Sequence, residues 1–209
     1  MSAYSMVLRK HSLHPGESWR PAAGQHAIWL REGTVDIGGQ PVGTGEGFFT
    51  AGTDSITPSG ATMAELLHFE ITATPAREGE GALLGAGLDL PDTNVILRLD
   101  QVTFPPGARA YRHVHPGPGI RCLTEGALEI QSDHHVETMT PMMAWFEDAD
   151  SPVQATAGPL QTAFVRAMVL PAAFEGKPTL RYLNAEDELK PRLQTNRRFF
   201  DRRLGLRSG

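Results

Sequence analysis

The clearest pattern of hydrophobic and polar positions lies in residues 94–104, where apolar and polar side chains alternate. Val95, Leu97 and Leu99 share one parity, and Ile96, Arg98 and Asp100 share the other. Alternation with a period of two is typical of a β-strand, and apolar residues on both faces indicate a strand that lies between two layers. Similar short runs are separated by many of the 22 glycines and 16 prolines. The pattern therefore predicts an all-β fold.

An internal repeat with an offset of 93 residues accompanies this pattern. Residues 25–33 parallel residues 119–126 when the Glu-Gly pair at 32–33 is laid on the Glu-Gly pair at 125–126. The aromatic pair at 48–49, after the glycine-rich residues 43–47, takes the place of the pair at 145–146 in the second copy. A repeat of this size indicates two copies of one supersecondary unit or domain.

The repeat predicts four segments along the chain. Residues 1–75 form the first copy and residues 94–172 the second, and residues 76–93, rich in Gly, Pro and Ala, link them and contribute one strand. Residues 173–209 form a basic C-terminal extension, which we expect to pack on the two copies or on a partner subunit.

Residues 105–130 hold the one closely spaced His-x-His of the chain, formed by His113 and His115. Two histidines one residue apart on a strand point to the same face, so both imidazoles can bind one ion. Neutral imidazole is a common ligand of divalent metals such as Zn, Fe, Ni or Mn. Since a metal site needs three or four donors, the pair alone leaves open whether any metal is bound.

These residues resemble the first signature of the cupin superfamily, which Gly107, His113, His115 and Gly126 match at the right spacings. The resemblance covers about residues 6–171. It implies a bicupin, with two tandem double-stranded β-helix (jelly-roll) barrels of which the N-terminal one is degenerate. Family members often pair through exposed edge strands, so the resemblance also implies a homodimer.

The sequence departs from the cupin pattern at two metal-ligand positions. Gly119 stands where the family has a glutamate, and Val153 stands where the second signature has its third histidine. The C-terminal copy therefore keeps a partial ligand set, with His113 and His115 as its candidate metal ligands.

Strand parity extends the candidate site beyond the histidines. If both rings face the interior of the C-terminal barrel, Arg109 and Tyr111 share that face, and Arg121 follows after the turn. A buried guanidinium needs an anionic partner, which is either an internal acid such as Glu147 or the carboxylate or phosphate of a ligand. Trp145 is expected to add an apolar wall, so the predicted ligand-binding residues are Arg109, Tyr111, Arg121 and Trp145.

The remaining histidines are assigned structural or surface positions. His26 occupies the place of the family's glutamate in the first copy, and one donor does not hold an ion. His11, His14 and His68 are interpreted as structural residues. Residues 134–135 belong to a polar hairpin turn, where surface exposure is expected.

Charge and composition restrict the partners. The extension after residue 172 carries nine basic and five acidic residues, which leaves a net charge of -9 on the rest of the chain. Because no recognised binding motif accompanies the basic residues, nucleic acid is an unlikely partner. Cys122 is the single cysteine, no apolar run approaches the ~20 residues of a membrane span, and the first residues show no signal pattern. We therefore expect a cytoplasmic protein without a membrane partner.

Two functions remain open at this point. In the first, the metal site is reduced or lost, and the C-terminal barrel binds a small organic anion. In the alternative, the resemblance implies a metal-dependent enzyme of the dioxygenase, isomerase or lyase type that uses His113 and His115. The residues at positions 119 and 153 favour the first interpretation.

Overall fold

The chain consists almost entirely of β-strands in the computed structural model, which describes residues 4–73, 79–90 and 94–206. Helical structure in these residues is limited to η1 (Ala172–Phe174) and α1 (Ala185–Glu188). The predicted all-β fold is confirmed. None of the helices in the described residues has the length and apolar character to cross a membrane.

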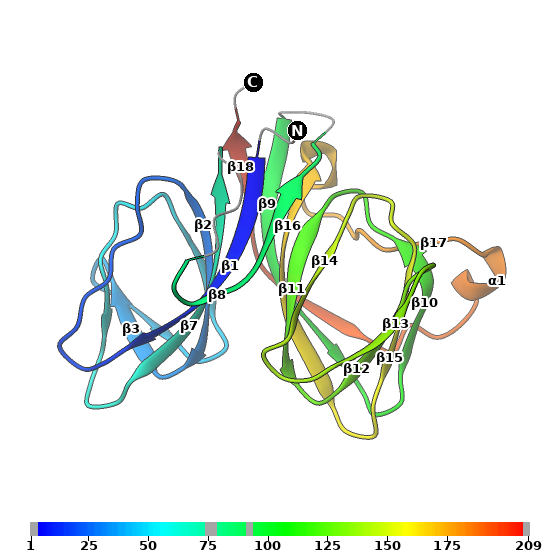
Figure 1. Ribbon diagram of the computed structural model, residues 1–209, viewed down its shortest axis with the longest axis horizontal. Helices are drawn as coiled ribbons and strands as arrows, with labels where there is room; N and C mark the ends of the chain where they lie inside the picture. The colour runs from blue at the N-terminus through cyan, green and yellow to red at the C-terminus, as the bar shows by residue number, and fades with distance from the viewer. Residues whose placement is uncertain (1–3, 74–78, 91–93, 207–209) are drawn as a thin grey trace. The chain divides into compact units, whose positions relative to one another are not determined.

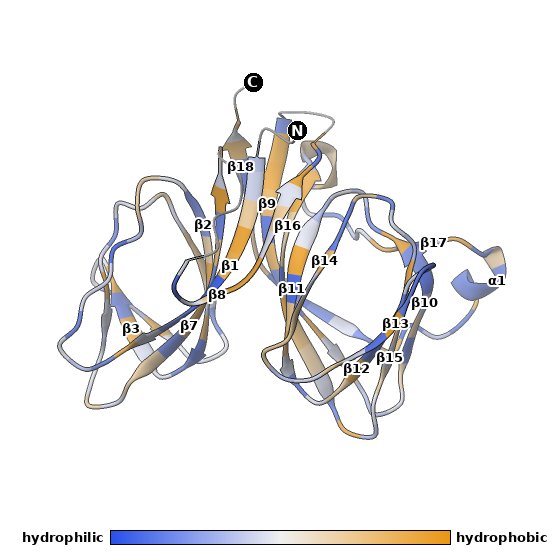
Figure 2. Ribbon diagram, viewed as in Figure 1, coloured by the Kyte–Doolittle hydropathy of each residue, from blue (hydrophilic) through white to orange (hydrophobic). Residues whose placement is uncertain are grey.

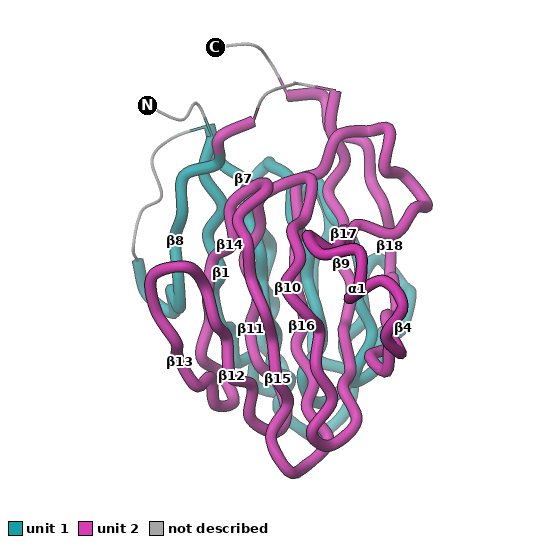
Figure 3. The backbone as a smooth tube through the Cα atoms, turned by 90° about the vertical axis from the view of Figure 1, so that its right-hand side faces the viewer, with its two compact units in different colours: residues 1–88, 209 teal, residues 89–208 magenta. Residues whose placement is uncertain are grey.

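The chain forms two compact units, residues 1–88 and residues 89–208 (Figure 3). The segment expected as a linker contains β8 (Ala82–Leu88), which pairs with β1 (Tyr4–Leu13) in the N-terminal unit. Residues 76–78 and 91–93 of that expected linker, and residues 1–3 and 207–209 of the expected outer segments, lie outside the described residues.

The N-terminal unit is a barrel of two sheets (Figure 1). Its apolar core lies between them and is centred on Ile28, Leu30 and Leu66. The larger sheet has the order β5 (Gly47–Thr50), β2 (Gln25–Glu32), β7 (Ala64–Thr72), β1 and β8, and the smaller has β4 (Gln40–Gly43), β3 (Thr34–Ile37) and β6 (Ile56–Pro58).

The C-terminal unit is a second two-sheet barrel with longer strands. One sheet has the order β13 (Val136–Met139), β12 (Leu128–Gln131), β15 (Val153–Ala157), β10 (Arg109–Val114) and β17 (Arg181–Tyr182). The other has β14 (Ala144–Glu147), β11 (Gly119–Glu125), β16 (Thr162–Pro171), β9 (Asn94–Phe104) and β18 (Thr195–Gly205). In Figure 2 the long strands β9 and β16 carry mostly hydrophobic residues, as their burial requires.

The internal repeat corresponds to matching strand pairs in the two barrels. Phe48 lies opposite Ile28 across β5 and β2, and Trp145 lies opposite Arg121 across β14 and β11. Both copies have a register irregularity just before the repeated Glu-Gly pair. At Gly126, with φ of +75°, a Cβ would lie 2.4 Å from the carbonyl oxygen of residue 161, so only glycine fits this turn.

The C-terminal extension forms part of the C-terminal barrel. β17 pairs with β10 in one sheet, and β18 pairs with β9 along its whole length in the other. The extension therefore adds an edge strand to each sheet and encloses the interior from one side.

Candidate functional site

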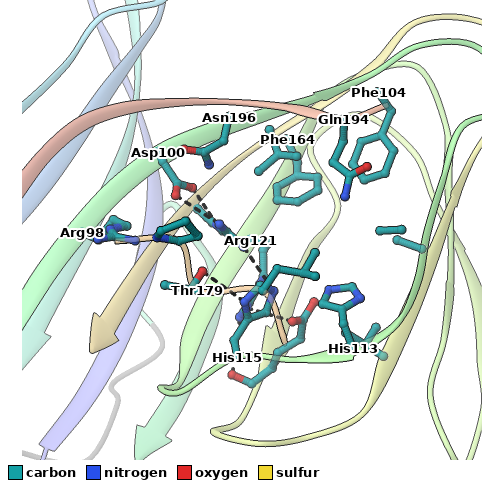
Figure 4. Close-up of a pocket in the computed structure, with 18 of the residues that line it drawn as sticks. Arg98, Asp100, Phe104, His113, His115, Arg121, Phe164, Thr179, Gln194 and Asn196 are labelled. Atoms are coloured by element: carbon teal, nitrogen blue, oxygen red, sulfur yellow. Dashed lines mark hydrogen bonds and ion pairs between the residues drawn. The ribbon is translucent and has the colours of Figure 1, made fainter. Parts of the chain in front are cut away.

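A cavity of about 230 Å³ lies between the two sheets of the C-terminal barrel. One part of its wall is apolar, and the other part is polar and contains both candidate histidines. Figure 4 shows Phe104, Phe164 and Gln194 gathered on one side, and His113 and His115 on the other. The apolar wall consists of Val102, Phe104, Ile130, Val153, Ala155 and Phe164, with Trp145 beside them.

A β-bulge in β10 decides which of the predicted residues reach this cavity. Ala110 pairs with Ala155 and His113 pairs with Val153, so two residues of β10 lie opposite one residue of β15. A bulge shifts the parity of all residues beyond it. Ala110 and His113 therefore face the same cavity, although they are three positions apart and would face opposite sides of a regular strand.

The prediction that Arg109 and Tyr111 face the interior is wrong for this reason. Arg109 is exposed, Tyr111 is half-buried, and neither lines the cavity. The ring of Tyr111 lies instead under Nζ of Lys190, 4.1 Å from its centroid. Regular alternation fails at the bulge, where the sequence itself contains no glycine to mark it.

His113 presents a free lone pair to the cavity. Its Nδ1 donates to the carbonyl oxygen of Tyr111 at 2.7 Å, so Nε2 is the unprotonated nitrogen. No hydrogen bond to this Nε2 is formed within residues 4–73, 79–90 and 94–206. Burial lowers the pKa of His113, and the ring is a neutral hydrogen-bond acceptor.

His115 has both ring nitrogens engaged. Nη1 of Arg166 donates to Nε2 at 3.3 Å, and Nδ1 donates to Oγ1 of Thr179 at 3.2 Å. A guanidinium has no acceptor, so Nε2 must carry the lone pair. Burial and then the charge of Arg166 hold the pKa of His115 well below its usual value, so this imidazole is neutral as well.

A row of charged residues crosses the five-stranded sheet that contains β11. Arg121 lies opposite Arg166, Arg166 lies opposite Asp100, and Asp100 lies opposite Arg198. Arg166 forms a two-pronged ion pair with Asp100, with Nε to Oδ1 at 2.6 Å and Nη2 to Oδ2 at 3.1 Å. Two arginines directly opposite each other repel, so this row depends on carboxylates.

Arg121 takes its carboxylate from inside the protein. Its Nη2 lies 2.8 Å from Oε2 of Glu147, without the alignment of a hydrogen bond, and its Nη1 donates to the carbonyl oxygen of Gly119. Trp145 donates from Nε1 to Oε1 of Glu147 at 2.8 Å. Burial lowers the pKa of Arg121 to about 10, although Glu147 acts in the other direction. The guanidinium remains charged at neutral pH, and its Nη2 can donate to a ligand carboxylate that displaces Glu147.

The C-terminal extension supplies a further part of the cavity wall that the sequence interpretation did not include. Thr179 contributes its hydroxyl, and alternate residues around the start of β18 contribute side chains. Their spacing of two was the available signal in the sequence, since alternate residues of a strand share one face. The alternating residues are Arg192, Gln194, Asn196 and Arg198.

The charged side chains of the cavity wall leave a positive excess. Five arginines but only two carboxylates line it, and Asp201 adds one carboxylate just behind the wall. Because both histidines are neutral, the net charge in this part of the barrel is positive by two. The arginines are Arg98, Arg121, Arg166, Arg192 and Arg198, and the two carboxylates are Asp100 and Glu147.

Comparison with solved structures identifies the architecture. The cupin 2 conserved barrel domain protein from Leptotrichia buccalis matches with a TM-score of 0.51 at 14% identity, over 79% of this chain and 84% of that chain. AerE from Microcystis aeruginosa matches with a TM-score of 0.59 at 10% identity, over 79% and 88%. This chain has the cupin fold.

An enzyme is among the solved structures that share this cupin fold. Salicylate 1,2-dioxygenase from Pseudaminobacter salicylatoxidans matches with a TM-score of 0.56 at 10% identity, over 94% of this chain and 75% of that chain. No family model and no curated protein matches the sequence. The likeness to solved structures establishes the fold alone.

The residues of this cupin barrel do not fit a bound metal. Within the part of the chain that the structure describes, no three His, Cys, Asp or Glu side chains lie together as a metal site requires. The lone pair of His115 already faces a guanidinium, which would also repel a cation. Val153 lies on the cavity wall opposite His113 and brings no donor.

Gly119 cannot be exchanged for the glutamate that the cupin pattern has at this position. A Cβ on Gly119 would lie 2.2 Å from the carbonyl oxygen of Ala167 and 2.9 Å from Cα of Met168. The strand β16 therefore approaches β11 too closely here for any side chain. The cross-strand neighbour of Gly119 is Glu147, and Arg121 and Trp145 already bind its carboxylate.

Three histidines form a hydrogen-bonded chain inside the N-terminal barrel. Nε2 of His26 lies 2.8 Å from the carbonyl oxygen of Ala22, Nδ1 of His26 lies 2.9 Å from Nε2 of His68, and Nδ1 of His68 lies 3.1 Å from Nε2 of His11. Because the carbonyl must accept, each ring carries its proton on Nε2. The three histidines lie on β1, β2 and β7, so their contact is not visible in the sequence pattern of any single strand.

Proposed function

We propose that the C-terminal barrel binds a small organic anion, with an apolar body, directly through protein side chains. The observation that carries this proposal is the positive excess on the wall of a cavity whose other side is apolar. An anion would lower the electrostatic cost of the buried arginines, and its body would cover Phe104, Phe164 and Val153. A volume of about 230 Å³ lies below the ~300–1,000 Å³ of pockets for drug-sized ligands, so the ligand is small.

Two groups on the wall are available to the ligand. Nη2 of Arg121 is buried and lies 2.8 Å from Oε2 of Glu147 without the alignment of a hydrogen bond, so a ligand carboxylate that displaces Glu147 can accept from it. Nε2 of His113 has a lone pair and suits a hydroxyl of the ligand. The ligand of this proposal therefore carries a carboxylate and an apolar body, and a hydroxyl group strengthens its binding.

A calorimetric and thermal-shift screen of small aliphatic and aromatic carboxylates tests the proposal. We expect at least one ligand whose affinity falls about tenfold or more in Arg121→Gln, since a charge-assisted hydrogen bond is lost. Arg181→Gln is the matched control, because Arg181 is exposed and lies outside the cavity wall. Where Arg121→Gln does not fold, the pair Arg121→Met with Glu147→Leu replaces it, which removes both charges together.

The metal-dependent enzyme that uses His113 and His115 is the alternative outcome of the same screen. It predicts that binding needs added Zn²⁺, Fe²⁺, Ni²⁺ or Mn²⁺ and disappears in His113→Ala. Ligand binding that is unchanged in the presence of a chelator supports direct binding. A panel without any bound carboxylate contradicts the proposal.

A further inference from the structure

Two guanidinium nitrogens on the cavity wall are buried without a hydrogen-bond partner among residues 4–73, 79–90 and 94–206. They are Nε of Arg198 on β18 and Nη2 of Arg121 on β11, and the latter lies 2.8 Å from Oε2 of Glu147 without the alignment of a hydrogen bond. Buried polar atoms almost always have a partner, and an unpartnered donor costs free energy. Both arginines line the same cavity, so a ligand can supply an acceptor to Arg198 and can compete with Glu147 for Arg121.

Arg198 is fixed in place by groups that leave its charge partly unbalanced. Its Nη2 donates to the carbonyl oxygen of Lys177 at 3.2 Å, and its Nη1 lies 3.4 Å from Oδ2 of Asp201. Asp201 already receives two hydrogen bonds from Arg98, at 2.6 and 2.8 Å. The Asp201 carboxylate therefore contacts two guanidinium groups and balances only one of the two positive charges. The charge of Arg198 can bind an anion.

The two donors lie at different ends of the charged row. In the sheet order β11, β16, β9, β18, Arg121 and Arg198 are separated by the ion pair of Arg166 and Asp100. Strands are spaced by about 4.8 Å, so the two backbones are about 14 Å apart, and each long side chain shortens that span inside the barrel. A single carboxylate cannot contact both donors across the ion pair between them.

We propose that the ligand is a small dicarboxylate with an apolar spacer, one carboxylate bound by Arg121 and the other by Arg198. This inference rests on the proposed function and names its ligand class. The spacer passes over the ion pair of Arg166 and Asp100 and contacts Phe164, which lies on the same wall. The C-terminal extension thereby supplies the group that distinguishes dicarboxylates from monocarboxylates.

The test compares chain-matched acids by isothermal titration calorimetry on the full chain. Succinate, glutarate and adipate are paired with butyrate, valerate and hexanoate. We expect one dicarboxylate to bind about tenfold or more tightly than its monocarboxylate partner, and Arg198→Gln to abolish this preference. Arg197→Gln is the control, because Arg197 lies on the same strand, is exposed and does not line the cavity.

The possible results separate the inference from the proposed function. Equal binding of mono- and dicarboxylates, or a preference that survives Arg198→Gln, overturns the dicarboxylate assignment and leaves anion binding intact. Failure of all six acids, together with a negative carboxylate screen, overturns both. Should Arg198→Gln be unfolded by circular dichroism, Arg198→Lys keeps the charge, removes Nε and serves as the second variant.

Discussion

Arg166 lies between Asp100 and His115, with Nη1 only 3.3 Å from Nε2 of the histidine. The same guanidinium binds both carboxylate oxygens of Asp100. Nε2 of His115, which would bind a metal in a His-x-His site, therefore accepts a hydrogen bond from the guanidinium of Arg166 instead. This arrangement makes His115 part of a charge network, and it determines how the site will respond to substitution.

Restoring the third histidine is expected to be insufficient for metal binding. Val153→His places an imidazole opposite His113, but Arg166 still covers His115. We expect the triple variant Val153→His, Arg166→Gln, Asp100→Asn to bind Zn²⁺ about tenfold or more tightly than Val153→His alone, because a donor is freed and a repelling charge is gone. Calorimetric titration with Zn²⁺ measures this, and equal affinities would contradict the blocking role of Arg166.

The buried ion pair of Asp100 and Arg166 is expected to show strong coupling. Asp100→Asn should lower the free energy of unfolding by about 3–5 kcal/mol, because it leaves a buried guanidinium without its carboxylate. The double variant Asp100→Leu with Arg166→Met should cost much less. Urea unfolding measures both, and Arg181→Gln, in an exposed ion pair, should change stability by less than about 1 kcal/mol. Additive effects of the two buried substitutions would argue against the pair.

Gly119→Ala is expected to destabilise the C-terminal barrel. The added Cβ would meet two backbone atoms of β16 at 2.2 and 2.9 Å, and a paired strand cannot move away without breaking its ladder. We expect a loss of about 1–3 kcal/mol, as for other overpacked positions. Gly205→Ala is the control, since no atom lies within 4 Å of its Cβ position. Equal stability of the two variants in urea would show that β16 can shift.

The stability of the N-terminal barrel is expected to decrease as the pH falls from 7 to 5. Burial lowers the pKa of His11 to about 4, and it also lowers the pKa of His26 and His68. The unfolded chain, with histidine pKa values near 6.5, takes up protons first, so acid favours unfolding. The slope is at most about 1.4 kcal/mol per pH unit for each histidine.

Urea unfolding at pH 7, 6 and 5 measures this dependence. His68→Gln should flatten the profile, because it removes the central ring of the histidine chain. The exposed His135, replaced by glutamine, should leave it unchanged. A profile that is flat in the native chain would mean that the three rings are protonated in the folded state as readily as in the unfolded one.

Glu147→Gln is expected to strengthen the binding of monocarboxylates. Glu147 occupies Arg121 in the free protein, so a ligand carboxylate must compete with it. Removing that competitor should improve affinity about tenfold, the effect of one charge-assisted contact. Calorimetry with the acids of the screen measures this, with the exposed Glu129→Gln as control. Unchanged or weaker binding would place the carboxylate of the ligand elsewhere in the cavity.

The barrel fold and its duplication were predictable because alternation and turn residues are local signals. The repeated aromatic pairs lie at equivalent strand positions, and the Glu-Gly pair marks the same turn in both copies. The inward position was predicted correctly only for the residues after the bulge, His113 and His115, because the bulge depends on pairing with β15 and not on the residues of β10 alone.

Contacts between strands that are distant in the sequence could not be predicted from the pattern of any single strand. Arg166 and Asp100 are visible in the sequence as charged residues within apolar strands, but their pairing requires the register of β16 with β9. In the same way, His11 and His68 are 57 residues apart and meet only because β1 pairs with β7. Polar side chains inside otherwise apolar strands, charged in one case and imidazole in the other, were the available signal for the two networks.

The position of β18 in chain order has a consequence for synthesis. A nascent chain that has reached residue 180 already contains His113, His115, Arg121 and the ion-paired residues Arg166 and Asp100. It still lacks β18, so the edge of the sheet at β9 is not yet covered. Arg198 arrives with the strand that covers this edge. Under the dicarboxylate proposal, the group that distinguishes one acid from another is thus added last, and substitutions confined to β18 can change that preference while the rest of the cavity wall stays the same.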